Sequence, residues 1–194
     1  MLASLSKSPF VGFAPWIIFS VVAKDVGWEV AGTAGLLSSA ILSYPSLERG
    51  RLKILDYAGF GFFAVLVVLG LFLDRSELDW LEDYSTVISM GTIAVVVFAS
   101  LRFVPFTEQY ARETVPEEVQ ETASYKHTNR HLTTVWGFVF LVVAVDSLIQ
   151  QLTDSRSALL DWIIPVAAIV GGFKYTGYYV AKVRAVAPGA GVAS

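Results

Sequence analysis

The chain has 194 residues, of which 55% are hydrophobic and 16% are charged. A soluble domain carries about 25% charged residues, so this composition is typical of a membrane protein. The net charge of −3 does not indicate binding to nucleic acid. The lack of cysteine excludes disulfides, thiolate metal sites and cysteine nucleophiles.

Apolar runs recur along the chain, each close to the ~17–25 residues that a transmembrane helix needs. They cover about 9–24, 26–44, 56–73, 84–105, 132–152 and 158–182. The predicted fold is therefore all-α, a single transmembrane domain over residues 1–194 with six helices in three hairpins. A cytoplasmic interfacial helical segment, 106–131, lies between the fourth and fifth helices.

The second predicted span carries a small residue at every fourth position. These residues are Gly27, Ala31, Gly35, Ser39 and Ser43. The spacing places them on one helix face, where small side chains let two helix backbones approach closely. We expect this face to pack against another helix of the same chain; self-association of two chains through it is the alternative.

The first half of the chain contains short stretches that resemble those of a known family. "FAPWIIFSVVAKDVGWEVAGTAGLLSSAILSY" places Pro15 before an Ile-Ile-Phe run, and the basic loop "LERGRLK" and later Trp80 with "STVISM" follow it. Over roughly residues 10–105 the chain resembles intracellular septation protein A and its relatives, which are small bacterial inner-membrane proteins. Ser85 stands where that family has proline, and the spacing from Trp80 is longer. The resemblance implies a role in cell-envelope construction and division, exerted through partners and without an established catalytic activity.

The loop between the third and fourth spans, "LDRSELDWLEDYS", is acidic. We expect a solvated loop with aromatic anchors at Trp80 and Tyr84, because charge runs are usually solvated.

Lysine and arginine are distributed unevenly between the two sets of loops. One side of the predicted membrane carries Lys7, Arg49, Arg51, Lys53, Arg102, Arg112, Lys126, Arg130, Lys182 and Arg184. The other side carries only Lys24, Arg75 and Arg156. Cytoplasmic loops retain basic residues. The bias predicts that both termini and the 106–131 segment are cytoplasmic.

The 106–131 segment opens with "FTEQYARETVPEEV". Phe106 and Tyr110 are four residues apart, so they share a helical face, and the pattern predicts two short helices. A simple helix–helix connection usually has only ~2–8 residues. The functional interpretation is a contact surface for a partner or for lipid headgroups, and the structural one is an interfacial helix. The expected contact residues are Phe106, Tyr110, Arg112, Lys126 and Arg130.

His127 and His131 have a spacing that would make them neighbours on a helix. Thr128 replaces the glutamate of an H-E-x-x-H motif, and structural zinc needs four ligands. No metal site is therefore expected, and these histidines are predicted to meet lipid phosphates together with Lys126 and Arg130.

Asp146 lies within the fifth span and Lys174 within the sixth. Charges inside a membrane are costly, so they are candidates for function. One interpretation is a proton or ion relay; the other is a helix-locking polar contact that involves Asp146, Ser147 or Gln150. Lys174 can reach toward Asp146 or extend to the inner interface.

No Ser-His-Asp order, phosphate-binding glycine loop or paired catalytic carboxylates is present, so no catalytic residue and no cofactor is predicted. The sequence favours a non-enzymatic accessory or scaffolding protein of a bacterial cell-envelope or lipid-handling assembly. It would lie in the plasma membrane, and its partners would be the lipid bilayer and a membrane protein or a second copy of the chain. The alternative is a small transporter or channel with a site at Asp146 and Lys174.

Overall fold

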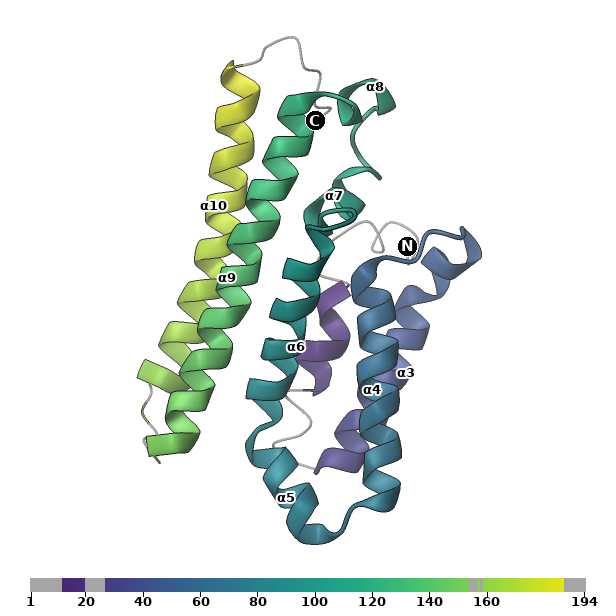
Figure 1. The fold of residues 1–194 in the computed structure, drawn as a ribbon, viewed down its shortest axis with the longest axis vertical. Coiled ribbons are helices and arrows are strands. Elements are labelled where there is room, and N and C mark those ends of the chain that lie inside the picture. Colours follow the sequence, from purple (N-terminus) through teal and green to yellow (C-terminus); the bar gives the residue numbers. More distant parts are fainter. Residues whose placement is uncertain (1–11, 20–26, 154–156, 158, 187–194) are drawn as a thin grey trace. The chain divides into compact units, whose positions relative to one another are not determined.

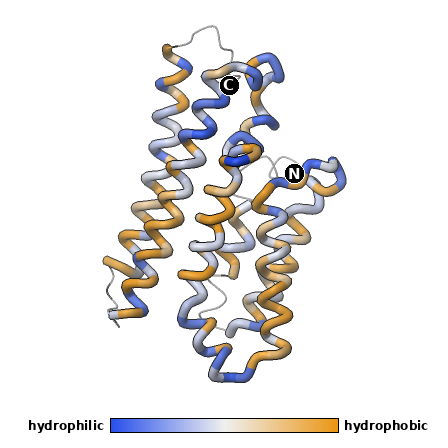
Figure 2. Tube along the Cα trace, in the orientation of Figure 1, coloured by the Kyte–Doolittle hydropathy of each residue, from blue (hydrophilic) through white to orange (hydrophobic). Residues whose placement is uncertain are grey.

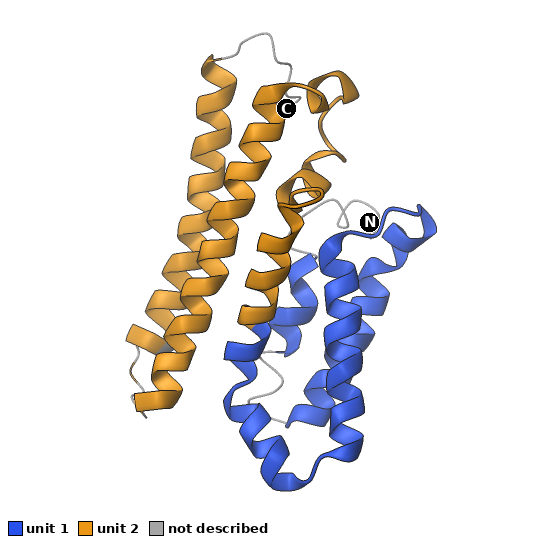
Figure 3. Ribbon diagram, in the orientation of Figure 1, with its two compact units in different colours: residues 1–89 blue, residues 90–194 orange. Residues whose placement is uncertain are grey.

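The computed structural model describes residues 12–19, 27–153, 157 and 159–186. This part of the chain contains helices and turns and no strand, which confirms the all-α prediction for it (Figure 1). The chain forms two compact units, residues 1–89 and 90–194 (Figure 3), and each is described by itself. The single transmembrane domain over residues 1–194 stays a prediction.

Unit 1 is built on the hairpin of α3 (Trp28–Glu48) and α4 (Ile54–Phe72). The helix at residues 12–19 belongs to the same unit, and α5 (Arg75–Asp83) follows α4. Gly50 makes the turn between α3 and α4 with φ of 62°, a conformation that glycine adopts at no steric cost.

The small-residue face of α3 is buried. Ala31, Gly35, Ser39 and Ser43 are all buried, whereas Gly27 precedes α3 as its N-cap residue, with φ of 87°. A Cβ at Gly35 would lie 2.5 Å from two ring carbons of Phe63 on α4. The structure therefore places this face against another helix of the same unit.

Aromatic side chains fill the space beside this hairpin. The rings of Trp16 and Phe62 have centroids 4.7 Å apart, and those of Phe19 and Phe63 are 5.5 Å apart. Trp28 meets Phe19 edge-on at 5.6 Å. Offset and edge-to-face pairs of this kind add to the stabilisation from burial. They anchor the helix at 12–19 to α3 and α4.

The acidic stretch after α4 is a helix, α5, and not the expected loop, although most of its residues are exposed as expected. Asp74 accepts a hydrogen bond from the Glu77 N–H at 3.0 Å, and Glu77 accepts from the Asp74 N–H at 3.1 Å. This capping box satisfies N–H groups that a helix start leaves without acceptors. Hydrogen bonds from Glu77 and Ser76 also hold the pKa of Asp74 below its usual range. Trp80 and Tyr84 stack on each other, with centroids 4.7 Å apart.

Unit 2 contains most of α6 (Ser85–Ser100) and the two short helices α7 (Phe106–Ala111) and α8 (Glu117–Gln120). They lead into α9 (Ala123–Thr153), and a π-helical turn at Leu159–Ile163 precedes α10 (Ile164–Val186). The two short helices predicted in the 106–131 segment are confirmed as α7 and α8.

The hairpin of α9 and α10 is joined by close contacts. Trp136 Nε1 donates to Thr176 Oγ1 at 3.1 Å, and the rings of Trp136 and Phe173 have centroids 4.6 Å apart. A Cβ at Gly137 would lie 2.6 Å from the Phe98 ring, so this glycine permits α6 and α9 to pack closely.

Three described helices are long and apolar enough to cross a membrane, namely α3, α4 and α9; α5 and α6, bent by 61°, would together make a fourth. Figure 2 shows the apolar stretches of these helices between polar ends. Of the first predicted span, only residues 12–19 are described, and they are helical. The arrangement of six spans in three hairpins therefore stays a prediction.

Candidate functional site

The polar segment between α6 and α9 is held by side chains from both of these helices. Ser100, at the end of α6, accepts a hydrogen bond from the Phe106 N–H at 2.9 Å and donates to the Val97 carbonyl at 2.6 Å. Arg130 Nη1 on α9 donates to the Leu101 carbonyl at 3.0 Å. These bonds satisfy backbone groups at two helix ends, so the segment has a defined structure.

Thr107 joins α7 to α9. Its N–H donates to Thr133 Oγ1 at 3.2 Å, and its hydroxyl donates to the Asn129 carbonyl at 2.8 Å. Thr133 is fully buried and Asn129 nearly so. Because buried polar groups must be hydrogen-bonded to be tolerated, this network fixes the position of α7 on α9.

Glu108 is a buried acid that is paired within α7. Its Oε1 accepts hydrogen bonds from Arg112 Nη2 at 2.6 Å and Nε at 3.1 Å. The Glu108 side chain is 7% exposed and that of Arg112 is 49% exposed. Arg112 was expected to be a contact residue of this segment, and in the structure it also neutralises the buried Glu108.

Phe106 and Tyr110 do share a helical face, and that face is covered by the protein. Phe106 is 1% exposed and Tyr110 4% exposed, and their rings meet edge-on at 5.4 Å. They fill the interior of the segment. Phe106 and Tyr110 are therefore not accessible to a partner or to lipid. The contact surface proposed for 106–131 is limited to the exposed charged side chains of the segment.

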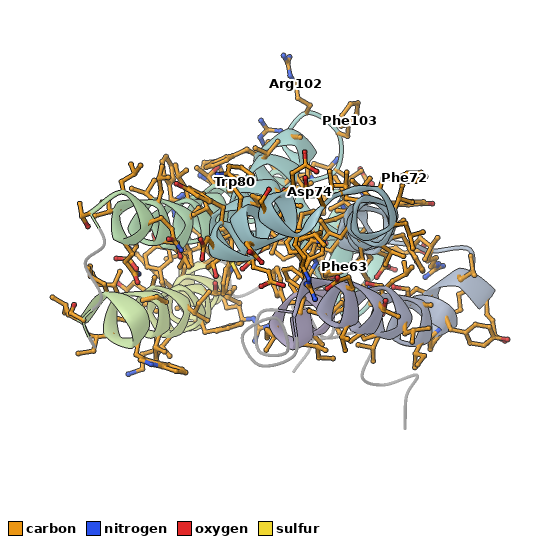
Figure 4. All side chains as sticks on the ribbon, turned by 90° about the horizontal axis from the view of Figure 1, so that it is seen from below. Phe63, Phe72, Asp74, Trp80, Arg102 and Phe103 are labelled. Carbon is orange, nitrogen blue, oxygen red and sulfur yellow. The ribbon has the colours of Figure 1, made fainter. Side chains whose placement is uncertain are left out.

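Exposed charges cover the outside of the segment. Lys126 pairs with Glu121 at 2.8 Å, and its hydrogen bond and charge hold the pKa of Glu121 below the usual range. Arg102 and Phe103 project from the turn after α6, clear of the neighbouring ribbon (Figure 4). Phe103 is 83% exposed, so it is an apolar group with no cover from unit 2.

The two histidines of 106–131 have different surroundings. His131 Nε2 is 2.8 Å from the Tyr175 hydroxyl, and its ring stacks on that of Tyr179 at 4.5 Å. His127 is exposed. Within the described ranges, no three His, Asp or Glu side chains are grouped so that they could hold a metal ion. His131 serves instead in the contact between α9 and α10.

Asp146 and Lys174 are not joined. Asp146 is 6% exposed, and its Oδ2 accepts a hydrogen bond of 3.1 Å from Gln150 Nε2 one turn further along α9. Ser147 is half-buried beside it, whereas Lys174 is exposed. The local contact with Gln150 is one of the two predicted interpretations of Asp146.

A cavity of about 170 Å³ lies where α8 and the beginning of α9 meet the C-terminal part of α10. Hydroxyl groups of Ser124 and Thr128 and aliphatic side chains of Val119 and Val183 line it. Arg184 is the one charged residue among the side chains lining it. No sequence motif indicates this site, because its walls come from segments more than fifty residues apart.

Comparisons with known protein families, with curated proteins and with solved structures found no match to this chain.

Proposed function

We propose that the protein is a non-enzymatic, multi-pass protein of a bacterial plasma membrane that acts as an accessory or scaffolding component of an envelope or lipid-handling assembly. The observation that supports this most directly is the 106–131 segment. Its hydrogen bonds join it to the adjoining helices, and its aromatic side chains Phe106 and Tyr110 are buried. Its exposed side chains are mostly charged. Such a rigid polar surface beside apolar helices suits the docking of another protein.

The membrane part of the proposal rests on the surface of the long helices. Leu71 is 77% exposed and Phe72 81% exposed at the end of α4, and α3 exposes Leu37 and Ile41. Apolar groups of this size on neighbouring turns need lipid or protein to cover them. Lipid is the cover that the composition and the helix lengths favour.

The orientation of the chain is proposed from its basic residues. A helix of 31 residues such as α9 is about 46 Å long at 1.5 Å per residue, whereas the hydrocarbon core is about 30 Å thick. The polar beginning of α9, with Lys126 and Arg130, would therefore lie outside the hydrocarbon region. The positive-inside rule places it, and with it both termini, in the cytoplasm.

The resemblance of residues 10–105 to intracellular septation protein A agrees with this function. It supplies the proposed setting, which is the bacterial cell envelope. The partner would be a membrane protein or a second copy of the chain.

A transporter is the second candidate, and the observation that favours it is the burial of Asp146 in the apolar part of α9. Acids at such positions often belong to ion pathways. Against this role, Gln150 already donates to one carboxylate oxygen, and the exposed Lys174 forms no ion pair or hydrogen bond with any residue that the structure describes.

The proposed function can be tested by recovering partners from native membranes after extraction with a mild detergent. Lys126→Glu and Glu118→Lys reverse exposed charges, and their structural cost should be small because exposed ion pairs contribute about 0–1 kcal/mol. Both variants should lose a partner that co-purifies in a fixed ratio with the wild-type chain. Asp79→Lys, on exposed α5, is the matched control. Partner recovery that is unchanged in all three variants would contradict a docking role for this segment.

A further inference from the structure

The cavity beside α10 is lined by polar groups that have no hydrogen-bond partner in the part of the chain that the structure describes. Among the described residues, the hydroxyls of Ser124 and Thr128 have no hydrogen-bond partner. By contrast, Thr122 donates to the Val119 carbonyl at 2.7 Å, and Thr134 to the Arg130 carbonyl at 2.9 Å. Two hydroxyls four residues apart on α9 are thus available to a ligand.

Arg184 gives the cavity its charge. It lies in the last turn of α10, and it makes no ion pair or hydrogen bond with any residue that the structure describes. No acid lines the cavity. Of the acids near it, Glu108 pairs with Arg112 and Glu121 with Lys126, while Glu117 and Glu118 on α8 are exposed and do not line the cavity. A guanidinium with adjacent hydroxyls is suited to a phosphate group, which it can bind with two parallel hydrogen bonds.

The rest of the lining is aliphatic. Val115 and Val119 come from the α7–α8 region, and Val180 and Val183 from α10. Exposed apolar side chains continue from this end along α10, including Tyr178, Val170 and Val166. A ligand that satisfies both parts of the lining has an anionic head and a hydrocarbon portion.

We propose that this cavity binds the phosphate headgroup of an anionic phospholipid, with the acyl chains lying along the apolar surface of α10. The volume of about 170 Å³ is below the ~300–1,000 Å³ that enclose a drug-sized ligand, so it holds a headgroup and leaves the chains outside. Anionic lipids are concentrated in the cytoplasmic leaflet. The inference adds to the proposed function the class of lipid that binds at the cytoplasmic ends of α9 and α10. It rests on the membrane placement in that proposed function.

The experiment uses the full chain, purified in mild detergent and freed of lipid. Phosphatidylglycerol is added, and native mass spectrometry measures how much is bound. The wild-type chain should bind one phosphatidylglycerol with an affinity about tenfold above that for phosphatidylcholine. Arg184→Gln should lower this affinity by about tenfold or more, because it removes a charged donor. Arg184→Lys should restore part of the affinity, because it keeps the charge without the planar fork.

Two further variants separate the site from general charge and from folding. Arg102→Gln removes the same charge from an exposed position outside the cavity and should bind as wild type does. Thr128→Val keeps the shape of the side chain, removes one unpartnered hydroxyl and should bind several-fold more weakly. If Arg184→Gln fails to fold, the Thr128→Val result decides.

Equal affinities in the wild type, Arg184→Gln and Thr128→Val would overturn the inference, and so would equal losses in Arg184→Gln and Arg102→Gln. Glycerol 3-phosphate in solution should not displace the lipid; displacement would show a site for a free phosphate ester and would overturn the lipid assignment. The proposed function has its own readout, which is retention of the chain in carbonate-washed membranes and recovery of its partner. If membrane retention or partner recovery is lost while phosphatidylglycerol still binds, the proposed function fails and the lipid site stands. If phosphatidylglycerol does not bind while membrane retention and partner recovery persist, the lipid site fails and the proposed function stands.

Discussion

The backbone N–H of Trp28 donates a hydrogen bond of 2.8 Å to Glu82 Oε1, across 54 residues of sequence. Trp28 is the first residue of α3, and Gly27 before it has no side chain that could cap the helix. The first N–H groups of a helix lack acceptors within the helix, and a negative charge is favourable there. A carboxylate from α5 therefore supplies the cap that the local sequence lacks.

Glu82→Ala should destabilise unit 1 by about 1 kcal/mol, the usual cost of losing an N-cap acceptor. Glu82→Gln keeps an acceptor oxygen and should cost less. Thermal unfolding of the purified chain in detergent measures both. Asp79→Ala removes an exposed acid from the same helix and is the control. A loss as large in Asp79→Ala as in Glu82→Ala would refute the tertiary cap.

Gly35→Ala should destabilise the α3–α4 hairpin by about 1–3 kcal/mol, the range for overpacked cores. The new Cβ would lie 2.5 Å from the Phe63 ring, which is fully buried and so has no exposed side toward which to move. Gly35→Leu should be worse. Gly61→Ala on α4 meets nothing within 4 Å and should be neutral or stabilising, because alanine favours helix. Equal melting temperatures for the Gly35 and Gly61 variants would contradict close packing at Gly35.

Phe106→Ala should loosen the 106–131 segment at a cost of about 3 kcal/mol or more, since it removes a fully buried ring. The measurement is the rate at which trypsin cuts after Arg112, which should rise in the variant. Phe103→Ala is the control, because Phe103 is almost fully exposed. A cleavage rate unchanged in Phe106→Ala would show that its ring does not hold the segment.

Asp146→Asn separates the two candidate functions. In an accessory protein the asparagine still accepts the hydrogen bond from Gln150 within α9, and the loss should be at most about 0.5–1.5 kcal/mol, the net contribution of one hydrogen bond. In a proton-linked carrier the same change would abolish flux into proteoliposomes. We expect unchanged partner recovery and no loss of flux. Lys174→Gln, an exposed position without contact to Asp146, is the comparison variant.

The proposed topology can be checked because the chain has no cysteine. Asp79→Cys should react with a membrane-impermeant maleimide in intact cells, and Glu118→Cys only after the membrane is opened. A reporter fused after Ser194 should be cytoplasmic. Labelling of both cysteines from the outside would contradict the predicted arrangement of six spans.

The sequence by itself determined the helical class and the position of most helices. Hydrophobic runs of sufficient length leave a backbone no better way to satisfy its N–H and C=O groups than a helix. The four-residue spacing of Gly35, Ser39 and Ser43 indicated a packing face, and "FTEQYARE" indicated a short helix with Phe106 and Tyr110 on one side. These features are local, so they can be read from spacing alone.

The tertiary structure decided which partner each of these faces meets. Spacing shows that Phe106 and Tyr110 share a face, but only the fold shows that the face is buried against the protein. The cap of Glu82 on Trp28 and the cavity at Arg184 join segments far apart in the chain. Such contacts depend on how helices pack, which depends on the shapes of many side chains at once and leaves no periodic signal in the sequence.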